Sequence, residues 1–441
     1  MALQQGGIQL LTIYDFKNQS NDQKLTFENL KKKCINIFIK NDFLMGTLVM
    51  QKGKVNLEIH EKKASGPENF IHEHVVDRKL FEKDTSYKEK SAILSKFKVN
   101  KGEFILKHSD ADDSKGNLAE IYLLRDEEDI NKSQKLAILL SVSHIIADGR
   151  TVYNIFNMLD DSNPNAIKTL DRNTIEYNDQ LYKHTNLAGK NGRNLLLDFG
   201  VKDILPWLAK SYTRSGKAEY DVKLYNYKVN LDEVNKVKKE YENLAINQFV
   251  STNDVLTSHF YQKNEKADYV NMNIDVRPRL MKYSFENEGQ NESENASSPF
   301  HLDLAGNYVA TLILRKQDLS SPLNIRKALN QKFTKSTNKK TDHQKRPPYK
   351  VIRSYPCAVS TNWATFYKPV KIDGLELELQ VPFFDEKSLD LRALGLKLCW
   401  EDSIIIFKCN DRDYGVYIIT GSNKISEESL EGDVMFGERL I

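Results

Sequence analysis

The sequence predicts a mixed α+β protein made of two similar domains, in each of which helices flank a mixed sheet. Three observations favour this fold class. The chain has 441 residues, which is more than one hydrophobic core usually serves. Segments of strand and helix character alternate along both halves, and a polar stretch with two glycines at 182–194 separates them. We therefore expect an N-terminal domain over 1–185, a linker over 186–200 and a C-terminal domain over 201–441, with part of 350–400 crossing back to the N-terminal domain.

The composition is that of an ordinary folded protein, with 40% hydrophobic and 28% charged residues. The 64 basic and 61 acidic residues leave a formal net charge of +3, so no overall field favours nucleic acid or an anionic membrane. An anionic ligand would have to be met by a local patch. We expect small-molecule partners and no nucleic acid.

The positions of the four cysteines and the N-terminal sequence indicate whether to expect a metal site and in which cellular compartment the protein acts. Cys34, Cys357, Cys399 and Cys409 form no CxxC pair, which fits neither a zinc site nor a disulfide framework. The N-terminus lacks the basic start and apolar stretch of a signal peptide. No run reaches the roughly 18 apolar residues of a membrane span. We expect a soluble, cytoplasmic protein with reduced thiols, no metal and no membrane span.

The N-terminal half begins with a helix from Phe27 to Ile39, in which apolar residues recur at three- and four-residue steps. Strands are predicted at 55–60, 102–108, 119–124 and 135–142. The last of these, KLAILLSV, is almost entirely apolar, as a strand in the centre of a sheet would be. A helix over 151–159 follows it. The residues between these two elements therefore lie at a strand-to-helix junction.

The C-terminal half repeats this mixture of elements. In order, we expect a helix capped by Asn230, a helix capped by Ser251, strands at 269–276 and 307–314, and a helix from Ser321 to Phe333. Two stretches break the pattern, because 285–298 is acidic, 334–348 is basic, and neither has periodicity. Both are expected to be exposed loops, although the lysines of the second would also suit a phosphate-bearing substrate.

The junction in the first half carries HIIADG, whose polar side chains are unusual after a buried strand. The imidazole of His144 is the side chain best suited to accept a proton near neutral pH. Asp148 would brace the loop, best through a bidentate pair with an arginine, since a buried unpaired carboxylate is costly. Gly149 would permit a tight backbone turn. The spacing alone also fits a histidine with a purely structural role. Other segments of the sequence are needed to choose between this role and that of a proton acceptor.

Four later segments support a functional interpretation of HIIADG. HIIADG (144–149) resembles the HxxxDG signature of the superfamily that includes BAHD acyltransferases, alcohol acetyltransferases, chloramphenicol acetyltransferase and peptide-synthetase condensation domains. The supporting segments, in matching order, are STNDVLTSHF (251–260), IDVRPRL (274–280), AGNYV (305–309) and STNW (360–363). The chain resembles a BAHD-like member of this superfamily over most of its length.

This resemblance implies two chloramphenicol-acetyltransferase-like domains with an active-site tunnel at their interface. Acyl-CoA would enter from one face, as a co-substrate rather than a bound cofactor, and a small alcohol or amine from the other. His144 would take the proton of the acceptor as it attacks the thioester directly. A covalent acyl-enzyme is not expected, since the chain offers neither a Gly-x-Ser-x-Gly elbow nor a cysteine with a nucleophile signature. The resemblance thus implies a monomeric acyl-CoA-dependent acyltransferase of secondary metabolism, more suited to ester than to amide formation.

The resemblance also implies roles for single residues. Thr361 and Trp363 occupy the positions at which BAHD enzymes are thought to supply oxyanion donors, and Asn362, in place of the usual serine, is an equally able amide donor. Trp363 fits a packed core indole as well. Ser251 and Thr252 would touch the pantetheine arm of CoA, although an N-cap role alone explains Ser251.

Two further pairs of residues complete the expected site. Asp148 would form its salt bridge with Arg277 or Arg279, which strand alternation over IDVRPRL places on one face. Gly306 and Asn307 would shape the wall of the tunnel and bind substrate or CoA there.

Two departures from the family pattern make the chain a divergent relative. The DFGWG motif of plant BAHD enzymes is missing, since only IDG (372–374) stands in the corresponding stretch. Ser143 replaces the first histidine of the HHxxxDG form that is typical of condensation domains and wax ester synthases. Two alternatives stay open: a free-standing condensation-type enzyme that takes its acyl group from a carrier protein, and a non-catalytic binding protein on the same scaffold.

Two other histidine features are set aside. His72 and His74 have ligand spacing on one face of a strand, but no third ligand stands nearby, so a metal site is not expected. His259 lies on an expected helix beside aromatic residues and is interpreted as a packing residue.

Overall fold

The computed structural model describes residues 7–17, 22–51, 54–59, 66–97, 105–106, 117–172, 223–244, 249–263, 269–281, 301–333, 358–384, 402–420 and 425–440. The expected linker and the expected acidic and basic loops lie outside these ranges, as do Cys357 and Cys399. A membrane-spanning helix would need more length and apolar character than any helix in these ranges has.

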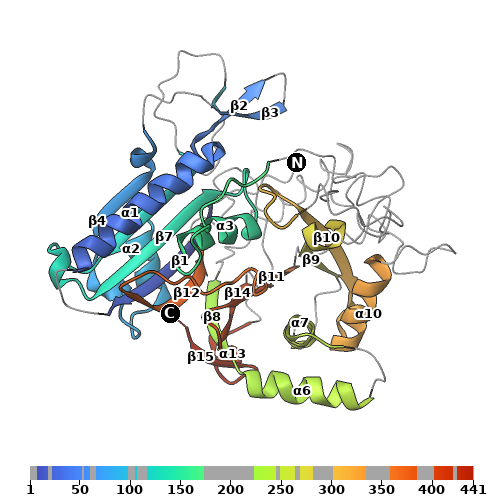
Figure 1. The fold of residues 1–441 in the computed structure, drawn as a ribbon. Coiled ribbons are helices and arrows are strands. Elements are labelled where there is room, and N and C mark those ends of the chain that lie inside the picture. Colours follow the sequence, from blue (N-terminus) through green and yellow to red (C-terminus); the bar gives the residue numbers. More distant parts are fainter. Residues whose placement is uncertain are drawn as a thin grey trace, which may run out of the picture.

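The N-terminal half contains a mixed sheet in which β7 is the central strand. Within the described residues its order is β12 (Leu375–Phe383), β1 (Gly7–Phe16), β7 (Lys135–Ser143), β6 (Ala119–Arg125) and β4 (Ile71–Val75). β4 and β6 run parallel, and the other neighbours run antiparallel. β7 is buried along nearly its whole length, which explains its apolar sequence. Figure 1 shows β12, which belongs to the second half of the chain, lying in the same layer as β1 and β7.

Helices cover this sheet through apolar stripes. α1 (Asp22–Lys40) buries residues spaced three and four apart, namely Phe27, Leu30, Cys34, Ile37 and Phe38. α2 (Tyr87–Leu94) starts at a capping box between Ser86 and Glu89, and α3 (Gly149–Phe156) follows β7. Short 3₁₀ turns lie at Asp42–Met45, Pro67–Phe70, Arg78–Leu80, Ile130–Lys132 and Asn157–Leu159, and β2 (Thr47–Gln51), β3 (Lys54–Glu58) and β5 (Ile105–Leu106) form a small separate sheet.

The second half contains a longer mixed sheet. Among the described strands its order is β10 (Val309–Arg315), β9 (Tyr269–Asp275), β11 (Ala358–Asn362), β13 (Ser403–Lys408), β14 (Tyr414–Thr420), β8 (Lys223–Val229) and β15 (Phe436–Arg439). β11 runs parallel to both its neighbours, and the remaining pairs are antiparallel. The helices are α6 (Leu231–Leu244), α7 (Thr252–Lys263), α9 (Lys316–Leu319), α10 (Pro322–Phe333) and α13 (Glu427–Glu431).

Two hydrophobic cores meet at the second sheet. Along β13, Ile404 and Ile406 pack in the core shared with α7 and α10, whereas Ile405 and Phe407 pack in the core of the N-terminal half. This follows from the alternation of side chains along a strand. Figure 1 shows α6, α7 and α10 on the side of this sheet away from the N-terminal sheet. The second sheet is therefore the layer that joins the two halves.

The expected fold class, mixed α+β with helices flanking mixed sheets, is confirmed. The central strand expected at 135–142 is β7, and the helix expected at 151–159 is α3 followed by a 3₁₀ turn. One expectation is wrong. IDVRPRL is not a continuous strand, because β9 ends at Asp275 and a helical turn begins at Arg277. Pro278 explains the change, since proline is favoured in the first turn of a helix and disfavoured within a sheet.

Candidate active site

HIIADG lies in the tight turn between β7 and α3. The N–H of Ile146 donates to the carbonyl of Ser143, the last residue of β7, at 3.1 Å. Asp148 is the N-cap of α3, with its carboxylate accepting from the N–H of Thr151 at 3.0 Å. Aspartate is among the best residues at this position, because its carboxylate satisfies a helix-end N–H. The local sequence therefore ends the strand, turns the chain and starts the helix.

Asp148 and Arg277 form a buried bidentate ion pair. The Nη1 of Arg277 donates to Oδ2 of Asp148 at 2.9 Å, and its Nη2 donates to Oδ1 at 3.1 Å. The two residues are 2% and 0% exposed. Arg279 does not share this role, since its Nη1 donates to the carbonyl of Asp275 at 3.3 Å. The expectation that both arginines share one face fails because they lie in a helical turn rather than a strand.

Further hydrogen bonds complete the environment of the Asp148 carboxylate. The hydroxyl of Thr151 lies 2.9 Å from Oδ1, and the N–H of Tyr308 donates to Oδ2 at 3.0 Å. Arg277 in turn donates Nε to the carbonyl of Leu304 at 2.9 Å and stacks on the ring of Tyr308. Buried ions are tolerated only when their remaining groups are bonded in this way. The turn from the first half is thus clamped by residues of the second half.

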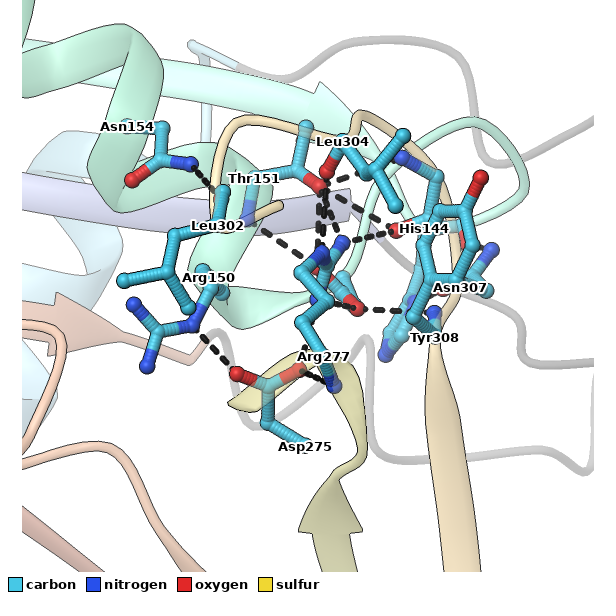
Figure 2. Close-up of polar contacts among 12 residues, drawn as sticks. His144, Arg150, Thr151, Asn154, Asp275, Arg277, Leu302, Leu304, Asn307 and Tyr308 are labelled. Carbon is cyan, nitrogen blue, oxygen red and sulfur yellow. Dashed lines mark hydrogen bonds and ion pairs between the residues drawn. The ribbon is translucent and has the colours of Figure 1, made fainter. Parts of the chain in front are cut away.

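A second ion pair extends this clamp. Asp275 accepts from Nη1 of Arg277 at 2.9 Å and also pairs with Arg150, the residue after Gly149 (Figure 2). The guanidinium of Arg150 lies over the ring of Phe366 at 4.6 Å. Opposite charges therefore alternate from Asp148 through Arg277 and Asp275 to Arg150, and the four charges cancel.

The sequence reasoning missed three members of this network. Arg150 and Thr151 lie outside the segments singled out in the sequence, and Asp275 lies within IDVRPRL (274–280) but was assigned no role there; Thr151 and Asp275 had local signals. Thr151 stands three residues after a helix-capping aspartate, where a side chain readily bonds the cap. Asp275 precedes Arg277 by two residues and accepts from its N–H at 3.2 Å. The pairing of Arg150 with Asp275 joins residues 125 positions apart, for which no local signal exists.

His144 directly follows β7, and the residue is half-buried. Loss of hydration holds the pKa of His144 below its usual value of 6.5, against smaller opposing effects of its own carbonyl, Asp148, Asn307 and the carbonyl of Ala147. The imidazole is therefore neutral at physiological pH. Its Nδ1 lies 3.2 Å from Oδ1 of Asn307. A neutral imidazole at a strand end is a group able to accept a proton.

Gly306 and Asn307 contact the turn directly. Gly306 has a φ of +141°, a region that favours glycine, and its carbonyl accepts from the N–H of Asp148 at 3.1 Å. Asn307 donates Nδ2 to the carbonyls of His144 and Ile145 at 2.8 and 3.1 Å. Both residues therefore hold the turn. This role is additional to the position in a tunnel wall that was expected for them.

Trp363 lies against the start of α3. A Cβ placed on Gly149 would come within 3.0 Å of Cε2 of the indole, so this glycine leaves room for the ring. Gly149 has no positive φ, so the expected reason for it, a tight turn, is wrong. Thr361 lies in β11 between Ile405 and Asn273. Of the three STNW residues expected at the site, Trp363 has a described contact with the motif, at Gly149.

Replacing Gly149 with alanine is expected to lower the free energy of unfolding by about 1 kcal/mol, because the new methyl group crowds the indole of Trp363. Alanine would otherwise stabilise a helix by about that amount, so the sign of the change is informative. Gly432→Ala is the matched control, since its nearest neighbour would be 3.6 Å away. Denaturant unfolding measures both. A Gly149→Ala protein as stable as the wild type would contradict the contact.

Ser251 and Thr252 bond within the second half. Ser251 and Asp254 form a reciprocal cap of α7, with the N–H of Ser251 donating to Oδ2 at 2.9 Å and the N–H of Asp254 donating to Oγ at 3.3 Å. Arg326 bonds both side chains. The hydroxyl of Thr252 accepts from Nζ of Lys238 at 2.7 Å. The described contacts of this pair hold α7 to α6 and α10 and do not reach the HIIADG turn.

The remaining candidate residues have structural partners. His72 lies 3.3 Å from a carboxylate oxygen of Glu120, and the described residues contain no group of three or more potential metal ligands. His259 does more than pack, since its Nε2 contacts both carboxylate oxygens of Asp433 at 2.8 and 3.0 Å. Cys34 is buried and free, and burial raises the pKa of its thiol to about 12. A thiol in this state is a poor nucleophile.

Comparisons with known proteins identify the fold. No family model matches the sequence, and no curated protein matches it. Vinorine synthase is similar over 99% of this chain and 91% of its own, with a TM-score of 0.54 and 9% identity. TRI101 of F. graminearum, complexed with ethyl coenzyme A, is similar over 98% and 94%, with a TM-score of 0.54 and 10% identity. The first condensation domain of the CDA synthetase matches over 97% and 88%, with a TM-score of 0.53 and 10% identity. The chain has the fold expected from its resemblance, that of BAHD-type acyltransferases and condensation domains.

Proposed function

We propose that this protein is an acyl-CoA-dependent acyltransferase that moves an acyl group from CoA to a hydroxyl or amine of a small molecule. The observation that supports this most directly is the state of His144. A neutral imidazole on a half-buried residue stands at the end of a central strand, in a turn clamped from the other half of the molecule by Arg277. A rigidly held base beside an interface between two halves suits a reaction between two substrates.

In the proposed reaction His144 accepts the proton of the acceptor while the acceptor oxygen or nitrogen attacks the thioester carbonyl. The resulting tetrahedral intermediate then collapses, the carbon–sulfur bond breaks, and the CoA thiolate takes the proton from the imidazolium. Acceptor and acyl-CoA thus give acylated product and free CoA without an acyl-enzyme. Substrates would meet in a tunnel between the halves, with Asp148 and Gly149 holding the turn. Asp148 acts as a brace and exchanges no proton.

The segment after β11 would stabilise the oxyanion. The backbone N–H of Trp363 already donates to the carbonyl of Ile406 at 2.7 Å, so its contribution would come from the indole N–H. The carbonyl oxygen of Asn362 accepts from Ala364 at 2.9 Å, so this side chain would offer its amide N–H groups. Thr361 would offer its hydroxyl. Each such donor is worth about 3 kcal/mol in other oxyanion holes.

Ester formation is proposed over amide formation. Among the similar structures, TRI3 of Fusarium sporotrichioides is a trichothecene 15-O-acetyltransferase, with a TM-score of 0.53. TRI101 structures of similar fold hold coenzyme A together with T-2 mycotoxin or deoxynivalenol. By this likeness we propose acyl-CoA as the co-substrate and a small hydroxylated molecule as acceptor, for a monomer acting in cytoplasmic secondary metabolism.

A condensation-type enzyme is the second candidate, because a condensation domain matches the fold as well as the acetyltransferases do. It would take its acyl group from a carrier protein supplied by another chain. Competition between acyl-CoA and acyl-carrier donors in one reaction separates the two.

Thermal shift with a panel of acyl-CoAs tests whether the protein binds the proposed donor, which distinguishes the proposed acyltransferase from its non-catalytic alternative. Stabilisation by at least one acyl-CoA is expected, and failure of every acyl-CoA to raise the melting temperature would contradict it.

The pH dependence of kcat/KM is expected to have its acid limb below pH 6.5. Burial lowers the pKa of His144, and only the neutral ring can accept a proton. Activity is therefore retained as pH falls through the ordinary histidine range and is lost only when pH passes through the lowered pKa. Initial rates between about pH 4.5 and 8 measure this, with circular dichroism at each pH as the control for unfolding. An acid limb above pH 6.5 would count against His144 as a buried base.

A further inference from the structure

A cavity of about 290 Å³ lies at the end of the N-terminal sheet opposite to the HIIADG turn. It is lined by Phe16, the last residue of β1, by the first turns of α1 and by residues 372–374. Gly7, at the other end of β1, pairs with Ser143. β1 has 10 residues, and at about 3.4 Å per residue the cavity lies roughly 30 Å from the turn. A ligand in this cavity therefore cannot be the acceptor that His144 would deprotonate.

One wall of the cavity is IDG (372–374), the tripeptide that stands where plant BAHD enzymes carry DFGWG. A hydrogen bond fixes this wall, since the N–H of Asp373 donates to Oδ2 of Asp161 at 2.9 Å. Gly374 has a φ of +80°, and a Cβ at this position would come within 2.5 Å of the hydroxyl of Thr26 in α1. Glycine therefore lets the wall approach α1 closely.

The charged residues of the cavity leave one carboxylate without a cation. Lys33 forms an ion pair with Asp161 and also donates to the carbonyl of Leu159 at 3.3 Å. The ammonium group of Lys33 is therefore committed to one of the two carboxylates in the lining. Asp373 carries the other carboxylate, which forms no ion pair with a described residue. The lining thus has one negative charge in excess, which favours a cationic ligand.

Neutral hydrogen-bond acceptors accompany this carboxylate. Gln23 lines the cavity and is 2% exposed. Its Nε2 donates to the carbonyl of Ser133 at 3.1 Å, which fixes the orientation of the amide, and no described residue donates to its Oε1. A buried acceptor without a donor is unfavourable. Thr26 and Asn29 add a hydroxyl and an amide oxygen to the lining. The polar part of the cavity therefore calls for a ligand that donates hydrogen bonds.

We propose that this cavity binds a small organic ammonium ion, at a site separate from the HIIADG turn. An ammonium group supplies one positive charge and up to three N–H donors, which match the carboxylate of Asp373 and the neutral acceptors. Phe16, Leu25 and Leu30 provide apolar surface for the rest of the ligand. Because a water molecule takes about 30 Å³ in the liquid, the cavity has room for roughly ten non-hydrogen atoms. The proposal goes beyond acyl transfer and does not rest on it.

Three probes of similar size test the requirement for charge. Benzylamine is a cation at pH 7, benzyl alcohol is its neutral analogue, and benzoate is an anion. In titration calorimetry on the full chain without acyl-CoA, benzylamine is expected to bind about tenfold or more tightly than benzyl alcohol, since a hydrogen bond to a charged group is the stronger one. Benzoate is expected not to bind. Equal affinities for benzylamine and benzyl alcohol, or no binding of benzylamine, would overturn the proposal, whether or not the protein is an acyltransferase.

Two variants at exposed positions assign the binding to this cavity. Asp373→Asn removes the charge but keeps the N–H bond to Asp161, and it is expected to weaken benzylamine binding about tenfold or more. Asn29→Lys adds a competing ammonium group to the lining and is expected to abolish the binding. If one variant fails to fold, unchanged affinity in the other would still contradict the site.

Asp232→Asn is the matched control, since Asp232 is an exposed aspartate in the first turn of α6, in the other half of the chain. It is expected to bind benzylamine as the wild type does. An equal loss of affinity in Asp232→Asn and Asp373→Asn would assign the effect to the overall charge of the protein and overturn the proposal.

Discussion

His144→Ala is expected to lower kcat/KM for acyl transfer by about 10²–10⁴-fold, the usual contribution of a general base. The melting temperature should fall much less than in a variant that breaks the Asp148–Arg277 pair, because His144 is half-buried and its described side-chain hydrogen bond is the contact with Asn307. The assay is the appearance of free CoA thiol in the presence of an acceptor. The alanine variant loses the proton acceptor but keeps the clamp of Asp148 and Arg277.

The matched control for this variant is His74→Ala. Loss of hydration also lowers the pKa of His74, and its ring packs on Phe97 in the first half of the molecule. This residue lies outside the HIIADG turn, so the control should keep wild-type turnover. Near-normal thiol release by His144→Ala, at a rate similar to His74→Ala, would exclude His144 as the base.

Breaking the Asp148–Arg277 pair is expected to cost about 3–5 kcal/mol of stability, the range for leaving one buried charge without its partner. In Arg277→Met, the carboxylates of Asp148 and Asp275 both lose their shared cation while remaining buried. A loss of this size is a large fraction of the 5–15 kcal/mol that stabilises most proteins. Asp148→Asn should also lower activity, because it weakens the hold on the turn.

Denaturant unfolding of the wild type, the two single variants and the Asp148→Asn/Arg277→Met double variant measures this coupling. The losses should be non-additive, since Arg277→Met leaves the Asp148 carboxylate without its cation, and Asp148→Asn leaves Arg277 with Asp275 as its remaining described anionic partner. Lys236→Ala provides the control, because its pair with Glu233 is exposed and should be worth less than about 1 kcal/mol. Additive losses, or an Arg277→Met loss as small as that control, would contradict the clamp.

Much of the site could be predicted where the signal was local. The apolar run before His144 identified a central strand, and Asp148 was expected to brace the turn before α3. The choice between Arg277 and Arg279 could not be made correctly by strand alternation, because β9 ends before Pro278. The crossing of β12 to pair with β1 was expected only in outline, since its register depends on a strand some 360 residues away.

Contacts between residues that are distant in the sequence could not be predicted from any one segment. Arg150 and Asp275 are charged residues of the kind that usually lies at a protein surface. In this structure they form an ion pair and their side chains are largely buried. Gly149 looked like a turn residue, whereas its lack of a side chain matters because Trp363 lies against it. Asn307 was expected in a tunnel wall, and only the positions of two carbonyls show how its amide is oriented. Such roles depend on distances across the two halves.

The most direct test of the account is the mass balance of one reaction. Wild-type protein is incubated with a panel of acyl-CoAs and a panel of alcohols and amines, and free thiol, acylated acceptor and intact protein mass are measured together. The proposed acyltransferase should release thiol and acylated acceptor in equal amounts with at least one combination, while the protein mass stays unchanged. Accumulation of an acyl-protein, or transfer from carrier-bound donors alone, would contradict it.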